Sequence, residues 1–244
     1  MLPLLIALAL APPWSEPADV TSGFPVRLVP PAHVFPADAA VSRPVTFGAT
    51  RAVAVANDER RVWVAFGRTD GSYGARRRLA TRKDGIRGSV IAANANGDIA
   101  VAWLERRGGT NDRVYIAFRP KGKPFTPPIR QATDRVRSVS IAVSPRGDIL
   151  LAWDARGVVK TRLKPARAPF FRRAETIESE PTFFARLRTA MTANGRAYVA
   201  WAAQLLTEGG TSGEGFYQVA VRPAGARRFR PAQLLERRPA TESA

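Results

Sequence analysis

The residues of this chain that could carry out chemistry are carboxylates and arginines in the segments that separate its apolar runs. Hydrolysis of a glycosidic bond requires two carboxylates held roughly 5 to 10 Å apart. Sequence spacing does not show which of these side chains meet, so we assign none of them a catalytic role and treat all as candidate binding residues. They are Glu105, Arg106, Asp112, Arg135, Asp154, Glu178, Glu180, Arg186 and Glu208.

Composition restricts the other chemistries. The chain has no cysteine, which excludes a thiolate nucleophile, a disulfide framework and a sulfur-ligated metal. Its single histidine, His33, would have to serve any Ser-His-Asp triad, and we interpret it as a surface or loop residue. The sequence therefore predicts neither a metal site nor a cofactor.

The segments around these candidates belong to a repeat. "NANGDIAVAW" at 94–103 returns as "SPRGDILLAW" at 144–153 and "TANGRAYVAW" at 192–201. Anchoring on the last aromatic residue of each copy, with Phe66 as the first, gives spacings of 37, 50 and 48 residues. A period near 48 with strand-like content predicts four-stranded blades of a β-propeller.

Each unit has the same parts. The Asn-Gly or Arg-Gly pair supplies the positive φ that a two-residue hairpin turn needs. A third strand follows and ends in a basic, proline-containing turn, at Arg119, Lys164 and Arg222, and a short last strand is predicted from Phe125, Phe170 and Phe229.

The second strand of each unit is apolar on both faces. Ile99, Val101 and Trp103 point one way, and Ala100 and Ala102 point the other. One bulky face and one small face are what stacked sheets require.

The first unit, from residue 51, is irregular. Its 61–68 segment aligns with the second strand of later units and equally well with the third, so one or two strands are either missing or supplied from upstream. The Pro-rich segment 19–50 could supply a strand that closes the ring against the C-terminal unit. We assign the repeats to 51–236 and a loose tail to 237–244.

The N-terminus predicts export. The apolar run from Leu2 to Ala11 has the length of a signal-peptide core and is too short to span a bilayer. We assign residues 1–18 to a signal peptide; an uncleaved anchor and a buried N-terminal segment are the alternatives.

The chain is strongly basic, with 38 basic against 20 acidic residues and a net charge of +18. Such a charge attracts nucleic acid, anionic lipid or envelope polymer. The arginines are scattered, which favours an arginine-rich composition of the whole chain as their origin. No basic segment is interleaved with aromatic residues, so nucleic acid is the least favoured partner.

The corner and basic-turn units resemble the repeats of secreted bacterial β-propeller proteins, in particular the loosely sialidase-like repeat proteins of actinobacteria. The likeness covers Arg51 to Glu236, although the Asp-box of true sialidases is not present. It implies propeller architecture and an extracytoplasmic setting. A sialidase-like site would also need clustered arginines and a tyrosine, and Tyr198 and Tyr217 lie in predicted strands.

Together these observations predict an exported all-β propeller of about four four-stranded antiparallel blades, complete, incomplete or closed by an N-terminal strand. Its predicted function is a non-catalytic binding or scaffold module at the cell envelope, with an anionic envelope polymer, a glycan or a protein as partner. A carbohydrate-active hydrolase that uses the loop carboxylates is the alternative. The binding face is predicted at the loops that join the second and third strands and the successive blades.

Overall fold

The computed structural model describes residues 34, 39–41, 45–47, 51–68, 72–107, 112–177, 183–206 and 212–238. Within these residues all of the regular structure is β-strand, and no helix long and apolar enough to cross a membrane is found there. The predicted signal peptide and His33 lie outside the described residues.

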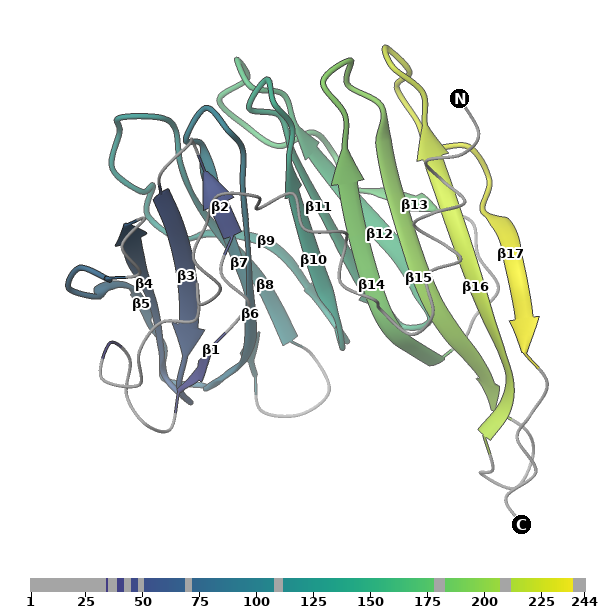
Figure 1. Cartoon of the computed structure of the whole chain (residues 1–244). Coiled ribbons are helices and arrows are strands. Elements are labelled where there is room, and N and C mark those ends of the chain that lie inside the picture. Colours follow the sequence, from purple (N-terminus) through teal and green to yellow (C-terminus); the bar gives the residue numbers. More distant parts are fainter. Residues whose placement is uncertain are drawn as a thin grey trace.

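The described strands form four antiparallel sheets (Figure 1). The first contains β1 (Ala40–Val41), β2 (Val45–Phe47), β3 (Arg51–Asn57), β4 (Arg61–Arg68) and β5 (Arg77–Thr81). The second contains β6 (Ile86–Ala93), β7 (Ile99–Arg106), β8 (Asp112–Arg119) and β9 (Ile129–Asp134). The third contains β10 (Val139–Val143), β11 (Ile149–Ala155), β12 (Val158–Lys164) and β13 (Glu175–Ile177). The fourth contains β14 (Phe183–Met191), β15 (Ala197–Leu206), β16 (Ser212–Arg222) and β17 (Gln233–Arg238).

Each of the last three sheets is a simple meander, with its strands in chain order. Successive sheets contact one another in chain order through their first strands, β6 with β10 and β10 with β14. No comparable contact joins the fourth sheet to the first among the described residues. Figure 1 shows the resulting arc, from β1–β5 at one end to β14–β17 at the other. The predicted architecture of about four antiparallel blades is confirmed.

The alternation of bulky and small residues builds the contacts between blades. Ala100 and Ala102 of the second blade share one core with Leu151 and Trp153 of the third. The bulky face of the second blade packs instead on the first blade, where Val101 contacts the cluster that contains Val53 and Val55. Each large apolar side chain buried in this way contributes about 1.5–3 kcal/mol. The prediction that successive sheets press together face to face is confirmed.

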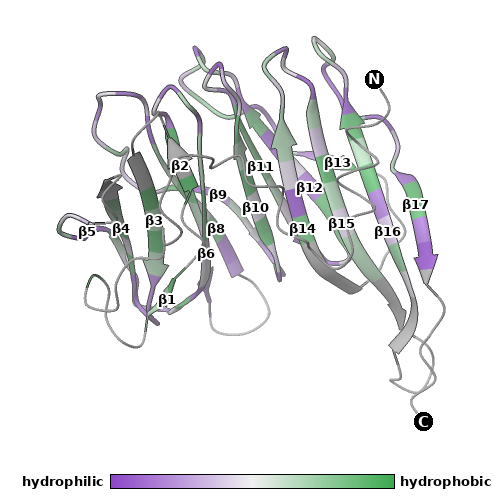
Figure 2. Ribbon diagram, in the orientation of Figure 1, coloured by the Kyte–Doolittle hydropathy of each residue, from purple (hydrophilic) through white to green (hydrophobic). Residues whose placement is uncertain are grey.

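Hydropathy follows the same plan. Figure 2 shows hydrophobic residues along the inner strands β10 and β11 and hydrophilic residues in β17 and in the turns. The outermost strand of each blade therefore faces water, and the inner strands supply the core.

The strand pairing of the first blade corrects the alignment of its sequence with the later repeats. β4 pairs with β3 as β8 pairs with β7, and both β4 and β8 carry a bulge at the same point. The residue equivalent to Trp103 is therefore Ala56, 47 residues earlier, and the choice of Phe66 as anchor was wrong. With Ala56 the repeat is regular throughout. The missing first strand is supplied from upstream, because β1 and β2 pair with β3 rather than with the C-terminal unit.

The hairpin turns have the expected backbone. Gly97, Gly147 and Gly195 have φ values of 97°, 88° and 86°. The acids beside them hold a second turn of the same blade. The carboxylate of Asp98 accepts a hydrogen bond from Lys121 N at 2.9 Å, and that of Asp148 accepts one from Ala166 N at 2.9 Å. These acids are therefore structural, as their position at hairpin turns indicated.

A second recurring contact joins neighbouring blades. In each blade a backbone N–H beyond the third strand donates a hydrogen bond to a carbonyl near the end of that strand. The residues that carry these carbonyls occupy equivalent positions in the four blades and are Phe66, Phe118, Leu163 and Val221. The next residue is basic in the last three blades, and we call Arg119, Lys164 and Arg222 the clasp residues. Arg119 lies over the ring of Phe66 at 5.0 Å, and Lys164 lies over the ring of Phe118 at 4.7 Å. Each of these two clasp residues thus reaches back onto the preceding blade.

The same backbone contacts correct the start of the third blade's last segment. Arg172 N bonds Leu163 O just as Thr126 N bonds Phe118 O, so Phe171 is the equivalent of Phe125. The last strands begin later than predicted: β13 begins at Glu175, five residues after Phe170, and β9 and β17 begin four residues after Phe125 and Phe229. Phe171 packs against the core, whereas Phe170 is 79% exposed.

Candidate functional site

The loop face, where β7 and β11 end and β8 and β12 begin, carries five of the nine predicted site residues within the described chain: Glu105, Arg106, Asp112, Arg135 and Asp154. The sheet ladders position four of these residues, because Glu105 pairs with Arg113, Arg106 pairs with Asp112, and Asp154 pairs with Val159. Three are buried acids, and the two arginines are exposed.

Glu105 is buried between two arginines. Its Oε2 lies 3.1 Å from Arg82 Nε, and its Oε1 lies 3.4 Å from Arg113 Nη1. The Arg82 guanidinium also lies over the ring of Tyr115, with Cζ 4.4 Å from the centroid. A carboxylate held in this way between two guanidinium groups fixes the junction of the first two blades.

Asp112 is held in a similar manner. Its Oδ2 accepts a hydrogen bond from Arg87 Nη1 at 2.8 Å, and the same nitrogen lies 3.5 Å from the carbonyl oxygen of Val136 in the segment before the third blade. Arg106 is exposed, and its backbone N–H donates to Gly85 O at 2.9 Å. Arg135 is also exposed, and its carbonyl accepts from Arg156 N.

Asp154 has no charged partner in an ion pair among the described residues. It is 2% exposed, and its Oδ1 accepts hydrogen bonds from Arg137 N at 2.7 Å and Ser138 N at 2.5 Å. Burial raises the pKa of the Asp154 carboxyl, and the N–H groups of Ser138 and Arg137 only partly offset this rise. The carboxyl closes the connection between the second and third blades.

We expect Asp154→Asn to change how stability depends on pH. Because the folded protein binds the Asp154 proton more tightly than the unfolded chain, ionisation of this group costs stability as the pH rises through its folded pKa. Asparagine keeps an oxygen for the two N–H groups but cannot ionise. The variant should therefore gain stability relative to wild type between about pH 3 and pH 7, measured by urea unfolding across this range.

Asp134 is the matched control because its environment has the opposite effect. Burial opposes its ionisation, but the hydrogen bond from Lys160 Nζ at 2.9 Å, the N–H of Arg135 and the charges of Lys160 and Arg156 outweigh burial and lower its pKa. Ionised Asp134 is stabilising, and this contribution is lost as the pH falls through its folded pKa. Asp134→Asn should lose stability relative to wild type over the same rise in pH; the same sign for both variants would contradict the assignment.

The structure does not place the remaining four predicted site residues beside Glu105, Asp112 and Asp154. Glu178, Glu180 and Glu208 lie outside the described residues, and the side chain of Arg186, which pairs with Ala202 across β14 and β15, is likewise outside the description. Tyr198 and Tyr217 lie in β15 and β16, as predicted.

Sequence reasoning missed the partners of the acids. Arg82 follows β5, Arg87 lies at the start of β6, and Arg113 lies at the start of β8. None of these arginines lies in the same strand as the acid that it binds. No local motif marks them. Within the described chain, no group of three or more His, Cys, Asp or Glu side chains could hold a metal ion.

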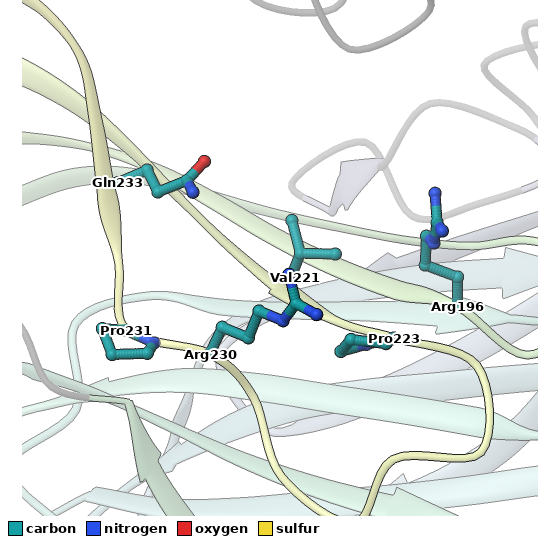
Figure 3. A pocket seen from close by; sticks show the side chains of 6 residues that line it. All are labelled: Arg196, Val221, Pro223, Arg230, Pro231 and Gln233. Atoms are coloured by element: carbon teal, nitrogen blue, oxygen red, sulfur yellow. The ribbon is translucent and has the colours of Figure 1, made fainter. Parts of the chain in front are cut away.

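Two cavities lie at the outer rim, away from these acids. The larger, about 230 Å³, lies beside β16 and the start of β17 at the free side of the fourth blade. Figure 3 shows the side chains that line it, with Arg230 next to Val221 and with Arg196 and Gln233 on opposite sides of the view. The smaller, about 40 Å³, lies between the third and fourth blades.

Comparison with known proteins identifies the fold. No family model and no curated protein matches the sequence. Among solved structures, the chain is similar to an α-L-arabinanase of Penicillium chrysogenum, complexed with arabinobiose, with a TM-score of 0.56 and 10% identity over 84% of this chain and 69% of that one. It is also similar to an arginine-to-alanine mutant of AofleA from Arthrobotrys oligospora, with a TM-score of 0.52 and 12% identity over 82% of this chain and 58% of that one. The chain therefore spans somewhat more than half the length of these proteins, and it has the β-propeller fold.

Proposed function

We propose that this protein is an exported, non-catalytic module that binds an anionic polymer of the cell envelope through its basic rim. One observation carries the proposal: the three buried acids of the loop face, Glu105, Asp112 and Asp154, are engaged by arginines or backbone N–H groups, whereas arginines stand exposed along the rim. These exposed arginines lie on or beside the outermost strands and are Arg76, Arg77, Arg78, Arg130, Arg172, Arg173, Arg227, Arg228 and Arg230.

The physical basis is the net charge of +18. Exposed guanidinium groups bind sulfate, phosphate and carboxylate oxygens in a bidentate manner and release counterions from a polyanion. Charged outer strands also discourage sheet-to-sheet aggregation. The apolar run at the N-terminus supports export, which would place such a rim next to envelope polymers.

The proposal predicts steeply salt-dependent binding. The full chain should bind immobilised dextran sulfate and not neutral dextran, and its affinity should fall at least about tenfold between 50 and 200 mM salt. Replacing Arg76, Arg77 and Arg78 together by glutamine should weaken binding and reduce the slope of log affinity against log salt. Equal binding to neutral dextran, or binding insensitive to salt, would defeat the electrostatic proposal.

A carbohydrate-active hydrolase is the second candidate. It is supported by the propeller fold shared with the arabinanase and by the burial-raised pKa of Asp154, which is the property of a general acid. Release of reducing sugar from arabinan by the wild-type chain, lost in Asp154→Asn, would favour the hydrolase over the binding module. Equal and negligible release by both would leave the binding module as the function.

A further inference from the structure

The junction between the third and fourth blades breaks the clasp pattern. At the two earlier junctions the clasp residue lies over an aromatic ring, Phe66 or Phe118. At this junction the equivalent residue is Leu163, which offers no ring to Arg222. Arg222 therefore lacks the ring contact that Arg119 and Lys164 have at the other two junctions.

A small cavity lies at that point. It measures about 40 Å³ and lies between the third strand and last segment of the third blade and the last turn of the fourth. Its lining is Thr161, Leu163, Arg172, Arg173, Glu175, Arg222, Arg227 and Phe229. Four arginines and one acid thus line this cavity. It lies where the other two junctions have an aromatic ring.

The arginines of this groove are poorly compensated. Arg222 is only 6% exposed, and its single hydrogen bond runs from Nη2 to Gly195 O at 3.3 Å, while its Nε has no partner within the described structure. Glu175, the one acid of the lining, accepts a hydrogen bond at Oε1 from Phe229 N at 2.7 Å. None of the four arginines forms an ion pair with a described carboxylate.

The electrostatic consequence is a surplus of positive charge. Burial lowers the pKa of Arg222, the nearby Arg172 lowers it further, and Asp148 and Glu175 act in the opposite direction. A buried guanidinium that faces a second guanidinium is costly, and an anion between them would remove that cost.

We propose that this groove binds a tetrahedral oxyanion, phosphate or sulfate, between Arg222 on its buried side and Arg172 and Arg227 on its exposed side. A water needs about 10–15 Å³ of such a cavity, so the groove has room for a group of a few heavy atoms. Guanidinium groups match the oxygens of phosphate and sulfate in geometry and charge. The site deepens the proposed function, on which its biological role rests, by naming where one ester of an anionic polymer would sit.

The site is tested by titrating the full chain with inorganic phosphate and with sulfate, at a constant ionic strength set by chloride. Calorimetry measures the binding. Arg172→Gln with Arg227→Gln should weaken binding at least tenfold, because two charge-assisted contacts are lost. Arg228→Gln removes a neighbouring exposed arginine that does not line the groove, and should change the affinity less than twofold.

A second variant works from the opposite direction. Leu163→Phe restores the ring found at the other junctions, fills the cavity and gives Arg222 a cation–π partner. It should weaken anion binding at least tenfold. Circular dichroism should show that the chain stays folded. This variant keeps the test decisive if the double replacement of Arg172 and Arg227 prevents folding.

Three results would overturn the site: no binding of phosphate or sulfate by wild type, equal loss in Arg228→Gln and in the double variant, or full binding in Leu163→Phe. The failure of the site can be told apart from failure of the proposed function. Unchanged dextran sulfate binding in the double variant, together with absent phosphate binding, removes the site alone. Phosphate binding without dextran sulfate binding removes the polymer proposal alone.

Discussion

Replacing Trp153 by alanine should lower the free energy of unfolding by about 3–5 kcal/mol. Its indole is 1% exposed and belongs to the core shared by the second and third blades. Its Nε1 has no hydrogen-bond partner among the described residues, so the loss comes from packing and the cavity that remains. Urea unfolding followed by far-ultraviolet circular dichroism measures the change.

Phe170→Ala is the control for this prediction. Phe170 is 79% exposed on the same blade, and its removal should change stability by less than about 0.5 kcal/mol. A loss below about 1.5 kcal/mol for Trp153→Ala, or equal losses in both variants, would show that the blades do not share a core at this junction.

Replacing Arg82 and Arg113 together by methionine should cost about 3–5 kcal/mol, because Glu105 would be left buried without a counter-charge. Methionine keeps much of the apolar length of the two side chains, so the effect isolates the charge. Equilibrium unfolding at neutral pH measures the loss.

Adding Glu105→Gln to the double variant gives the matched rescue. A neutral amide needs no counter-charge, so the triple variant should recover part of the lost stability. If Glu105→Gln alone is as damaging as the double variant and the triple recovers nothing, the interpretation of Glu105 as a structural acid is wrong.

The repeat made most of the fold predictable. The alternation at Val101, Ala102 and Trp103 is a local property of one strand, and it correctly indicated two apolar faces and stacked blades. The first blade was harder because alanine, at Ala56, stands where the other blades have tryptophan. That face packs against Val34, on a smaller cluster than the ones between blades, and a strand without the large residue gave no anchor in the sequence.

The site was predictable only in part. The repeat predicted that Glu105, Asp112 and Asp154 lie in connecting loops of one face, whereas they lie within strands, near the ends of β7 and β11 and at the start of β8. Their engagement by Arg82, Arg87 and the N–H groups before β10 depends on how neighbouring blades dock, which no local pattern encodes. The groove at Arg222 could have been found by aligning the third strands, since Leu163 stands where the two preceding blades have Phe66 and Phe118.

The clasp also distinguishes the two ends of the chain. In the first blade the position of the clasp residue is taken by Gly67, and the ring of Tyr73 lies 2.8 Å from where a side chain would begin. The hairpin-turn acids Asp98 and Asp148 lie near the clasp residue of the following blade, which is Lys164 or Arg222. In the fourth blade the equivalent turn residue is Arg196. The last blade of one molecule and the first blade of another therefore carry neither half of this contact. Head-to-tail stacking of the described fourth blade on the first blade of another molecule would lack this contact.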